Sequence, residues 1–249
     1  MASFGRPCNP LNSKWYEENT LVDMCCSLRS DTRIVCERRK RKDGGKKITK
    51  NVKVQPFKRI NLQTACEVHF VQADSVSVKI VGPENVIKHI KTTSDGTELT
   101  IQHTRNNGWK NLRSCDDVDI YLTSPDLISV LMRGAGDFNI DRHLDTDTLT
   151  IRLEGAGDVE IKDLICDEVN VEMKGAGDIE LEQVIASKAS FKLKGVGDVK
   201  AHLAKCDWAQ CELEGVGDIE LSGTVRHFRH KVRGTGSINT DDLQILSNR

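Results

Sequence analysis

The sequence lacks a long hydrophobic run, and this absence limits the classes of protein that it can encode. No stretch of about 18 apolar residues occurs in the 249 residues, which excludes a transmembrane helix. The N-terminus also lacks the apolar core of a secretory signal peptide. We therefore expect no membrane-spanning segment and see no export signal.

The chain also lacks a strong net charge and a large apolar content. Its formal net charge is −1 at pH 7, so the chain as a whole has no electrostatic attraction to nucleic acid or to an anionic membrane. Apolar residues make up 38% of the sequence, which predicts a narrow interior. A β-helix has such an interior, and at this length an all-β chain is often a single domain.

What the sequence does contain is a short phrase, Gly-x-Gly-Asp, that returns six times between residues 131 and 239. The first glycines of successive copies are 21, 20, 20, 20 and 19 residues apart, and a near-constant period of this kind is typical of a solenoid. The last copy has Ser237 in place of Asp. We expect a structural turn at Gly134, Gly136, Asp137, Gly155, Gly157, Asp158, Gly175, Gly177, Asp178, Gly195, Gly197, Asp198, Gly215, Gly217, Asp218, Gly234 and Gly236.

Apolar and polar residues alternate on both sides of each copy, which indicates strands with one buried face. The column two residues before the first glycine is Met132, Leu153, Met173, Leu193, Leu213 and Val232. The column four residues after it is Phe138, Val159, Ile179, Val199, Ile219 and Ile238. With a short third strand such as 164–166, about 20 residues make one coil of an all-β, right-handed parallel β-helix. The Leu/Asn signature of leucine-rich repeats is absent.

The glycines explain how the chain turns between strands. Two glycines separated by one small residue permit a positive φ or a close approach of neighbouring coils, where a Cβ would clash. The Asp that follows can accept hydrogen bonds from backbone N–H groups that the bend leaves unpaired. We therefore interpret the repeated phrase as structural rather than catalytic.

An outward column of charged residues supports stacking of the coils. Three residues before the first glycine, the later copies have Arg152, Glu172, Lys192, Glu212 and Lys231, so the sign alternates from coil to coil. Opposite charges on adjacent strands stabilise their register by a few tenths of a kcal/mol per pair. The column one residue before the glycine alternates less regularly and reads Arg133, Glu154, Lys174, Lys194, Glu214 and Arg233.

The nine cysteines show no disulfide or metal pattern. They are Cys8, Cys25, Cys26, Cys36, Cys66, Cys115, Cys166, Cys206 and Cys211. No Cys-x-x-Cys pair and no His at zinc spacing occurs, so we expect neither a metal site nor a cofactor. Cys166 and Cys206 share a column two coils apart, with Ala186 between them, so their Cα atoms should lie about 9.6 Å apart. This is too far for a disulfide, and free thiols suit a reducing compartment.

The residues before the repeat divide into an N-terminal extension and an irregular first part of the β-helix. Residues 1–47 form an extension, either disordered or capping, with an irregular amphipathic helix over 15–28 and a basic run at 38–42. This run fits a solvated hinge better than a nucleic-acid patch. The β-helix domain extends over 48–245, and 246–249 is a tail. Within it, 64–67 forms a degenerate first turn, 85–90 a helical turn and 104–116 a projecting loop, and strand 118–122 precedes the glycine coils.

Several of these segments together resemble a known bacterial family. The segments 57–70, 76–80 and 95–101, followed by the Gly-x-Gly-Asp coils that close on 236–239, resemble the putative auto-transporter adhesin, head GIN domain family over about residues 50–243. The resemblance implies a right-handed parallel β-helix, a location in the cell envelope and an adhesin role without established catalytic residues. The missing signal peptide and the free cysteines suit the cytoplasm instead.

Three classes of function remain open. A β-helix polysaccharide lyase or glycosidase needs clustered carboxylates, whereas Glu160, Glu180 and Glu220 form a regular column interrupted by Lys200. A calcium-stabilised repeat would use the Asp column. The favoured class is a non-enzymatic, adhesin-like binding scaffold for a protein or polysaccharide, with Trp208 as its exposed contact and with a homo-oligomer as an option. We expect no nucleic-acid partner.

Overall fold

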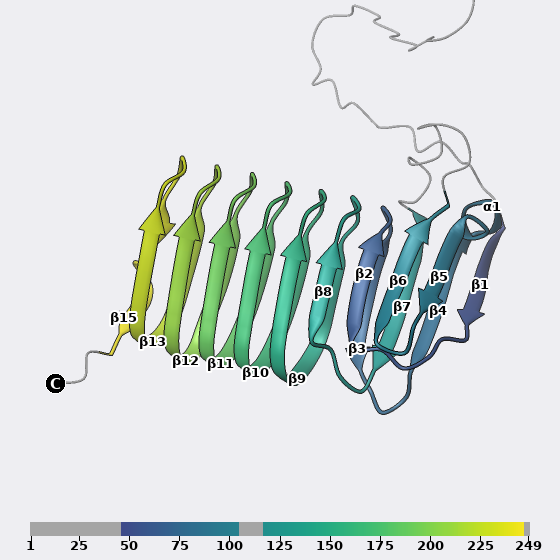
Figure 1. Ribbon diagram of the computed structural model, residues 1–249, viewed down its shortest axis with the longest axis horizontal. Helices are drawn as coiled ribbons and strands as arrows, with labels where there is room; N and C mark the ends of the chain where they lie inside the picture. Colours follow the sequence, from purple (N-terminus) through teal and green to yellow (C-terminus); the bar gives the residue numbers. More distant parts are fainter. Residues whose placement is uncertain (1–45, 105–116, 247–249) are drawn as a thin grey trace, which may run out of the picture. The chain divides into compact units, whose positions relative to one another are not determined.

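The computed structural model describes residues 46–104 and 117–246, which form a β-solenoid (Figure 1). The solenoid has about six turns of roughly 20 residues each. The predicted all-β, parallel β-helical fold is confirmed. The one helix among the described residues is α1 (Glu84–Ile87), which overlaps the helical turn expected at 85–90. In this part of the chain no helix is long and apolar enough to cross a membrane.

Each glycine coil consists of one long strand rather than three short ones. The strands are β9 (Phe138–Leu153), β10 (Val159–Met173), β11 (Ile179–Leu193), β12 (Val199–Leu213) and β13 (Ile219–Val232). The expectation of a separate third strand at 164–166 was wrong, because these residues belong to one bent strand, β10, that extends on both sides of them. Shifts in the strand register mark the bend, for example between Leu181 and Val184.

The inward columns stack into one narrow core. The inward column of Val171, Phe191 and Cys211 shows how large and small side chains together fill the core. The aromatic ring of Phe191 lies between two smaller side chains in the adjacent coils. All three side chains are at most 2% exposed. The strict alternation in the sequence therefore predicted the buried side chains of β9 to β12. It was wrong for Val232 in the last coil, which is 45% exposed because no described strand stacks on it there.

Antiparallel strands close the N-terminal end of the stack. These strands are β1 (Lys47–Val52), β4 (Ser77–Pro83) and β5 (Ile90–Ser94). β1 pairs with β4, and β4 pairs in turn with β7 (Asp119–Ser124), all antiparallel. β5 forms an antiparallel pair with β6 (Glu98–His103). The two faces of the solenoid are thus extended by strands that run against the coils.

The first coils do not stack in chain order. β2 (Arg59–Gln63) lies between β6 and β8 (Ser129–Met132), and β3 (Glu67–Gln72) lies between β7 and β9. The degenerate first coil therefore contacts the first glycine coil directly, although about 60 residues separate them in sequence. Strand 118–122 precedes the glycine coils in the stack, as expected, but it does not lie beside them, because the coil of β2 and β3 lies between β7 and β9.

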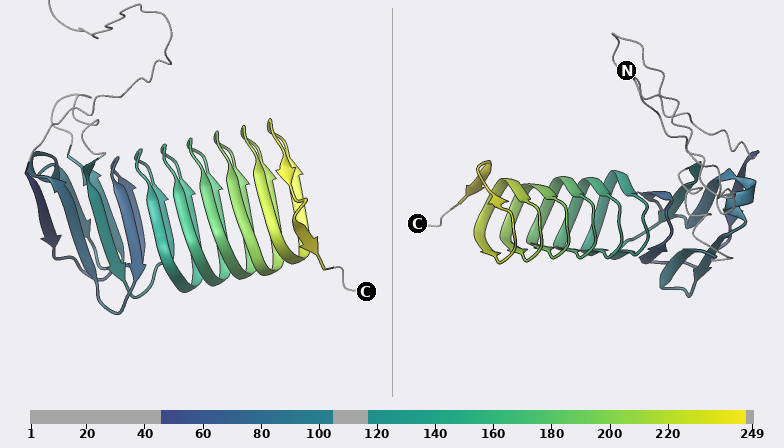
Figure 2. Two further views of the ribbon diagram at one scale, coloured as in Figure 1. Left: turned by 180° about the vertical axis from the view of Figure 1, so that it is seen from behind. Right: turned by 90° about the horizontal axis from the view of Figure 1, so that it is seen from above.

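The C-terminal end is only partly covered. β14 (Ile238–Asn239) and β15 (Leu243–Ile245) pair with the first part of β13, as far as Val225. Among the described residues, no strand pairs with 226–232 on the side that faces away from β12. Figure 2 shows this last coil at the C-terminal end of the stack. The predicted helix at 15–28, the basic run at 38–42 and most of the loop at 104–116 lie outside the described residues.

Candidate functional site

At the repeated turn the backbones of successive coils touch. A Cβ added to Gly175 would lie 1.8 Å from the carbonyl oxygen of Gly155 in the coil before it. Gly177 has a φ of +139°, and a Cβ there would lie 2.1 Å from the Gly157 oxygen. No other residue type fits either distance. The residue between the two glycines points outward and forms a parallel bridge, as Ala176 does with Val196.

The Asp of each turn binds the next coil. The Oδ1 atom of Asp158 accepts a hydrogen bond from the backbone N–H of Asp178 at 2.8 Å, and Asp178 accepts one from Asp198 at 2.9 Å. The ladder ends at Asp218, which accepts from both the N–H and the hydroxyl of Ser237. These two donors hold the pKa of the Asp218 carboxyl below its ordinary value of 3.8. Backbone N–H groups thus bind one oxygen of each of these carboxylates.

In the part of the chain that the structure describes, no group of three or more His, Cys, Asp and Glu residues could hold a metal ion. The acids that a glycan-active enzyme would use do not gather at one place. Glu160, Glu180, Lys200 and Glu220 occupy one register position in four successive coils. They form a single row along the solenoid. Acid–base catalysis instead needs a cluster of groups around one point.

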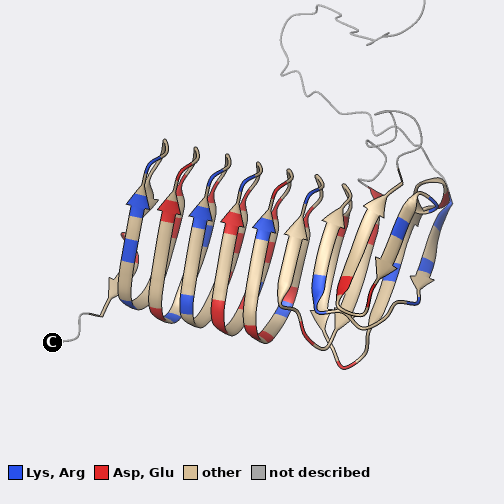
Figure 3. Ribbon diagram, viewed as in Figure 1, with Lys and Arg blue, Asp and Glu red and all other residues tan. Residues whose placement is uncertain are grey.

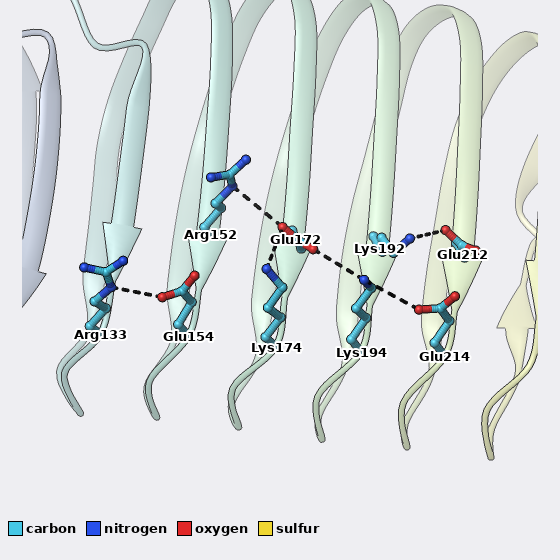
Figure 4. A network of polar contacts seen from close by, with 9 residues as sticks. All are labelled: Arg133, Arg152, Glu154, Glu172, Lys174, Lys192, Lys194, Glu212 and Glu214. Atoms are coloured by element: carbon cyan, nitrogen blue, oxygen red, sulfur yellow. Dashed lines mark hydrogen bonds and ion pairs between the residues drawn. The ribbon is translucent and has the colours of Figure 1, made fainter.

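Charged side chains connect the coils along one face (Figures 3 and 4). Lys192 donates a hydrogen bond to Glu212, and Lys231 lies 3.6 Å from the same carboxylate. Glu172 lies 3.2 Å from Lys174 and 3.8 Å from Lys194. The two consecutive lysines in the less regular column therefore share a carboxylate from the other column, which explains why they tolerate each other.

Three cysteines on the core side form no disulfide. Cys166 and Cys206 are both opposite Ala186, on the two sides of that residue, so their predicted register is confirmed. Neither they nor Cys211 form a disulfide. Burial raises the pKa of Cys166 and of Cys211 to about 12 and that of Cys206 to about 11. Thiols with such pKa values are poor nucleophiles and poor metal ligands at neutral pH.

Trp208 lies on the outer surface of β12, where the residue is 45% exposed. The His227 ring of the next coil stacks on it with a centroid distance of 4.2 Å. The guanidinium of Arg229 lies 5.8 Å from the centre of the indole, within the range of a cation–π interaction. The indole is therefore fixed by two neighbours from β13, and it still exposes a large apolar area.

A shallow groove of about 380 Å³ extends from Trp208 across the outward side chains of four coils. Its polar lining is Glu168, Asn170, Lys188, Ser190, Gln210 and Arg229. The outward column of Trp208 already contained Glu168 and Lys188 in the sequence. Sequence reasoning missed the adjacent column of Asn170, Ser190, Gln210 and Arg229, although its period of about 20 residues was a usable signal. The arrangement offers an aromatic platform, both signs of charge and neutral hydrogen-bonding groups.

Solved bacterial structures share this fold. A putative adhesin from Bacteroides fragilis is 25% identical, with a TM-score of 0.66, and the match covers 78% of this chain and 96% of that chain. A putative lipid binding protein from Parabacteroides distasonis is 19% identical, with a TM-score of 0.52, and covers 79% and 94%. The second likeness shows the fold alone.

A comparison of family models identifies the chain more directly than these structures do. The search of curated proteins gave no significant match. The model of one family matches residues 56–201 and 181–247, which together cover the glycine coils and the irregular coils before them. These residues are well over half of the chain, and the family's description names an adhesin and not an enzyme. The chain therefore belongs to the family described as putative auto-transporter adhesin, head GIN domain.

Proposed function

We propose that this protein is a non-enzymatic binding scaffold that holds an extended polysaccharide in the groove beside Trp208. The observation that carries the proposal is the exposed indole, which is held between His227 and Arg229 at the edge of a polar groove. Trp208 combines a large exposed apolar surface, with the residue 45% exposed, and a position fixed by two neighbours. Fixed aromatic rings bind ligands without a large entropic cost.

The lining of the groove favours a sugar over a purely apolar ligand. The face of a sugar ring presents C–H groups that pack on an indole, and its hydroxyls need donors and acceptors at the rim. Ser190, Asn170 and Gln210 supply neutral ones, and Lys188 and Glu168 supply charged ones. His227 covers the indole from β13, whereas the rest of the groove lies towards β11 and β10. The ligand would therefore lie against the face of Trp208 that is turned towards β11.

The regular stack favours an extended ligand. From β10 to β13 the groove crosses three strand spacings, which is about 14 Å. Neutral polar side chains recur at one position in three successive coils, Asn170, Ser190 and Gln210, so a linear polymer would meet similar groups as it crosses. Catalysis needs a set of different groups held at one place. This repeated neutral column supports binding without turnover.

Calorimetric titration against a panel of bacterial envelope polysaccharides tests this proposal. We expect Trp208→Ala to weaken the binding of a positive polysaccharide about tenfold or more, as for a central aromatic contact. Tyr121→Ala is the matched control, because Tyr121 is 41% exposed and stacks on His69 in the same manner, but belongs to other strands. This control should bind like the unmodified chain.

Product analysis by mass spectrometry must accompany the titration. Turnover of any polysaccharide that is lost in Glu160→Gln or Glu180→Gln would replace the scaffold by a glycan-active enzyme. Binding that is equally strong in Trp208→Ala would place the ligand elsewhere on the molecule and contradict the proposed site.

A further inference from the structure

The last coil exposes a basic strand edge that no described segment covers. The second half of β13, residues 226–232, has an open side that faces away from β12. This stretch and the residue after it read Arg-His-Phe-Arg-His-Lys-Val-Arg, with Lys or Arg at four of eight positions and His at two. The edge shares His227 and Arg229 with the groove proposed above, but its open backbone faces away from β12 and therefore from the groove.

The backbone of this edge is ready to pair with another strand. Thr150, which occupies the position of Arg229 four coils earlier, donates its N–H to Ile128 in the preceding coil at 2.9 Å. The direction of hydrogen bonds alternates along a parallel strand, so the N–H and C=O groups of Phe228 and His230 point to the open side. An unpaired row of this kind is a template for strand addition.

The charges of the edge have partners on one side only. On the side of β12, Arg226 lies 3.3 Å from Asp207, Lys231 lies 3.6 Å from Glu212 and Arg233 lies 3.8 Å from Glu214. Elsewhere in the solenoid, the same two columns place a basic residue between acids from both neighbouring coils, as Lys194 lies between Glu172 and Glu214. The open side of β13 therefore lacks an acidic neighbour that the pattern of the fold provides in its interior.

Apolar surface lies at the same end of the stack. In the previous coil Leu213 is fully buried, whereas Val232 at the same position in β13 is 45% exposed. Ile245 and Leu246, which follow at this end, are 53% and 50% exposed. A strand added beside 226–232 would cover Val232 and Phe228 and extend the core by one coil.

We propose that this edge binds an extended acidic segment of a partner protein, which pairs with residues 226–232 as an additional strand. The unpaired backbone favours a peptide over a polyanionic glycan, because a glycan has no backbone with which to continue the sheet. The charges favour an acidic peptide over a second copy of this chain. Pairing two copies of the edge would bring rows of Arg and Lys together, and like charges opposite each other are destabilising.

The neighbouring coils supply a matched pair of probe peptides. The acidic probe is a peptide of residues 206–214 with Cys206→Ser and Cys211→Ser. It carries Asp207, Glu212 and Glu214. In the folded chain the same segment pairs with the edge of β13 opposite to the open one. The control is residues 186–194, which carries Lys192 and Lys194 in the columns of Glu212 and Glu214, and Lys188 in the column of Trp208. Fluorescence anisotropy with the full chain should show the acidic peptide binding at least about tenfold more tightly, with affinity that falls as salt is added.

A proline variant separates strand addition from simple charge attraction. His230→Pro removes an N–H that points to the open side and breaks no bond to β12, and an edge strand tolerates proline there. It should weaken the acidic peptide about fivefold or more, whereas His230→Ala should change the affinity less than about twofold. Circular dichroism checks that both variants remain folded.

Three results would overturn the proposal. Equal binding of the acidic and basic peptides would show that the edge does not select charge. Binding that His230→Pro leaves unchanged would show attraction without strand pairing, as would equally tight binding of the polyanion heparin. Self-association of the chain at micromolar concentration, lost in His230→Pro, would assign the edge to a second copy.

Discussion

At the scale of single residues, the repeated phrase divides its work between the glycines and the aspartates. The glycines make room for the carbonyl oxygens of the preceding coil, and a Cβ at Gly177 would lie 2.1 Å from the Gly157 oxygen. Asp178 adds one hydrogen bond to the next coil. A side chain that overlaps backbone atoms can be accommodated only if the backbone of a neighbouring coil shifts, which is strongly destabilising. One exposed hydrogen bond, in contrast, contributes only about 1 kcal/mol.

Gly177→Val should therefore destabilise the protein by about 3 kcal/mol or more, which combines the clash with the cost of a left-handed φ. Asp178→Ala should cost about 1 kcal/mol. Ala176→Val should be nearly neutral, because Val196 and Val216 occupy the same place in later coils and are at least half exposed. Urea denaturation of the three variants measures the order. A larger loss in Asp178→Ala than in Gly177→Val would show that the carboxylate has a further role.

The buried thiols should react slowly in the folded protein. Burial raises the pKa of Cys206 from 9.0 to about 11, so at pH 8 its thiolate fraction is about a hundredfold lower than in the unfolded chain. Cys166 and Cys211, with pKa values of about 12, should react still less. Peptide mapping after alkylation with iodoacetamide should find these three cysteines modified only in denaturant. A disulfide between Cys166 and Cys206 would contradict the register.

At the scale of elements, the sequence predicted the faces of the strands but not their continuity. The period of two identifies inward residues such as Val171 and Phe191 without reference to any neighbour. Whether a strand breaks or bends at a corner depends on hydrogen bonds to the coils on both sides, which no local pattern records. The charge columns on the outer face were also predictable, because their residues recur with the period of the coil.

Lys192→Glu tests whether the charge columns hold the strands in register. The change places three acids in one row, from 172 to 212, where Lys192 now pairs with Glu212. We expect a loss of about 1 kcal/mol at low salt, which shrinks in 1 M NaCl because screening weakens the repulsion. Lys192→Met keeps the apolar stem and is the control. A loss that is equal at both salt concentrations would assign the effect to packing.

At the scale of the whole molecule, the order of the coils could not be predicted from the sequence. The glycine coils follow one another because a turn of fixed length connects each to the next. The coil of β2 and β3 carries the same alternation, but nothing in its sequence says that β6 and β7 will stack on its far side. The sequence singled out Trp208 as an exposed contact, but the groove beside it and the column of Arg229 in its lining were not predicted. The groove, the charge columns and the open edge all depend on one continuous register.

Pulsed electron paramagnetic resonance tests that register most directly. It measures the distance between two nitroxide labels, each attached to a keto-bearing amino acid that replaces a native residue. Tyr121, His69, Asn139, Glu160, Glu180 and Lys200 occupy successive positions in one row. The account predicts about 19 Å between positions 69 and 200 and about 24 Å between 121 and 200, four and five strand spacings. The reverse order, with position 121 nearer to 200 than position 69, would contradict the stack described here.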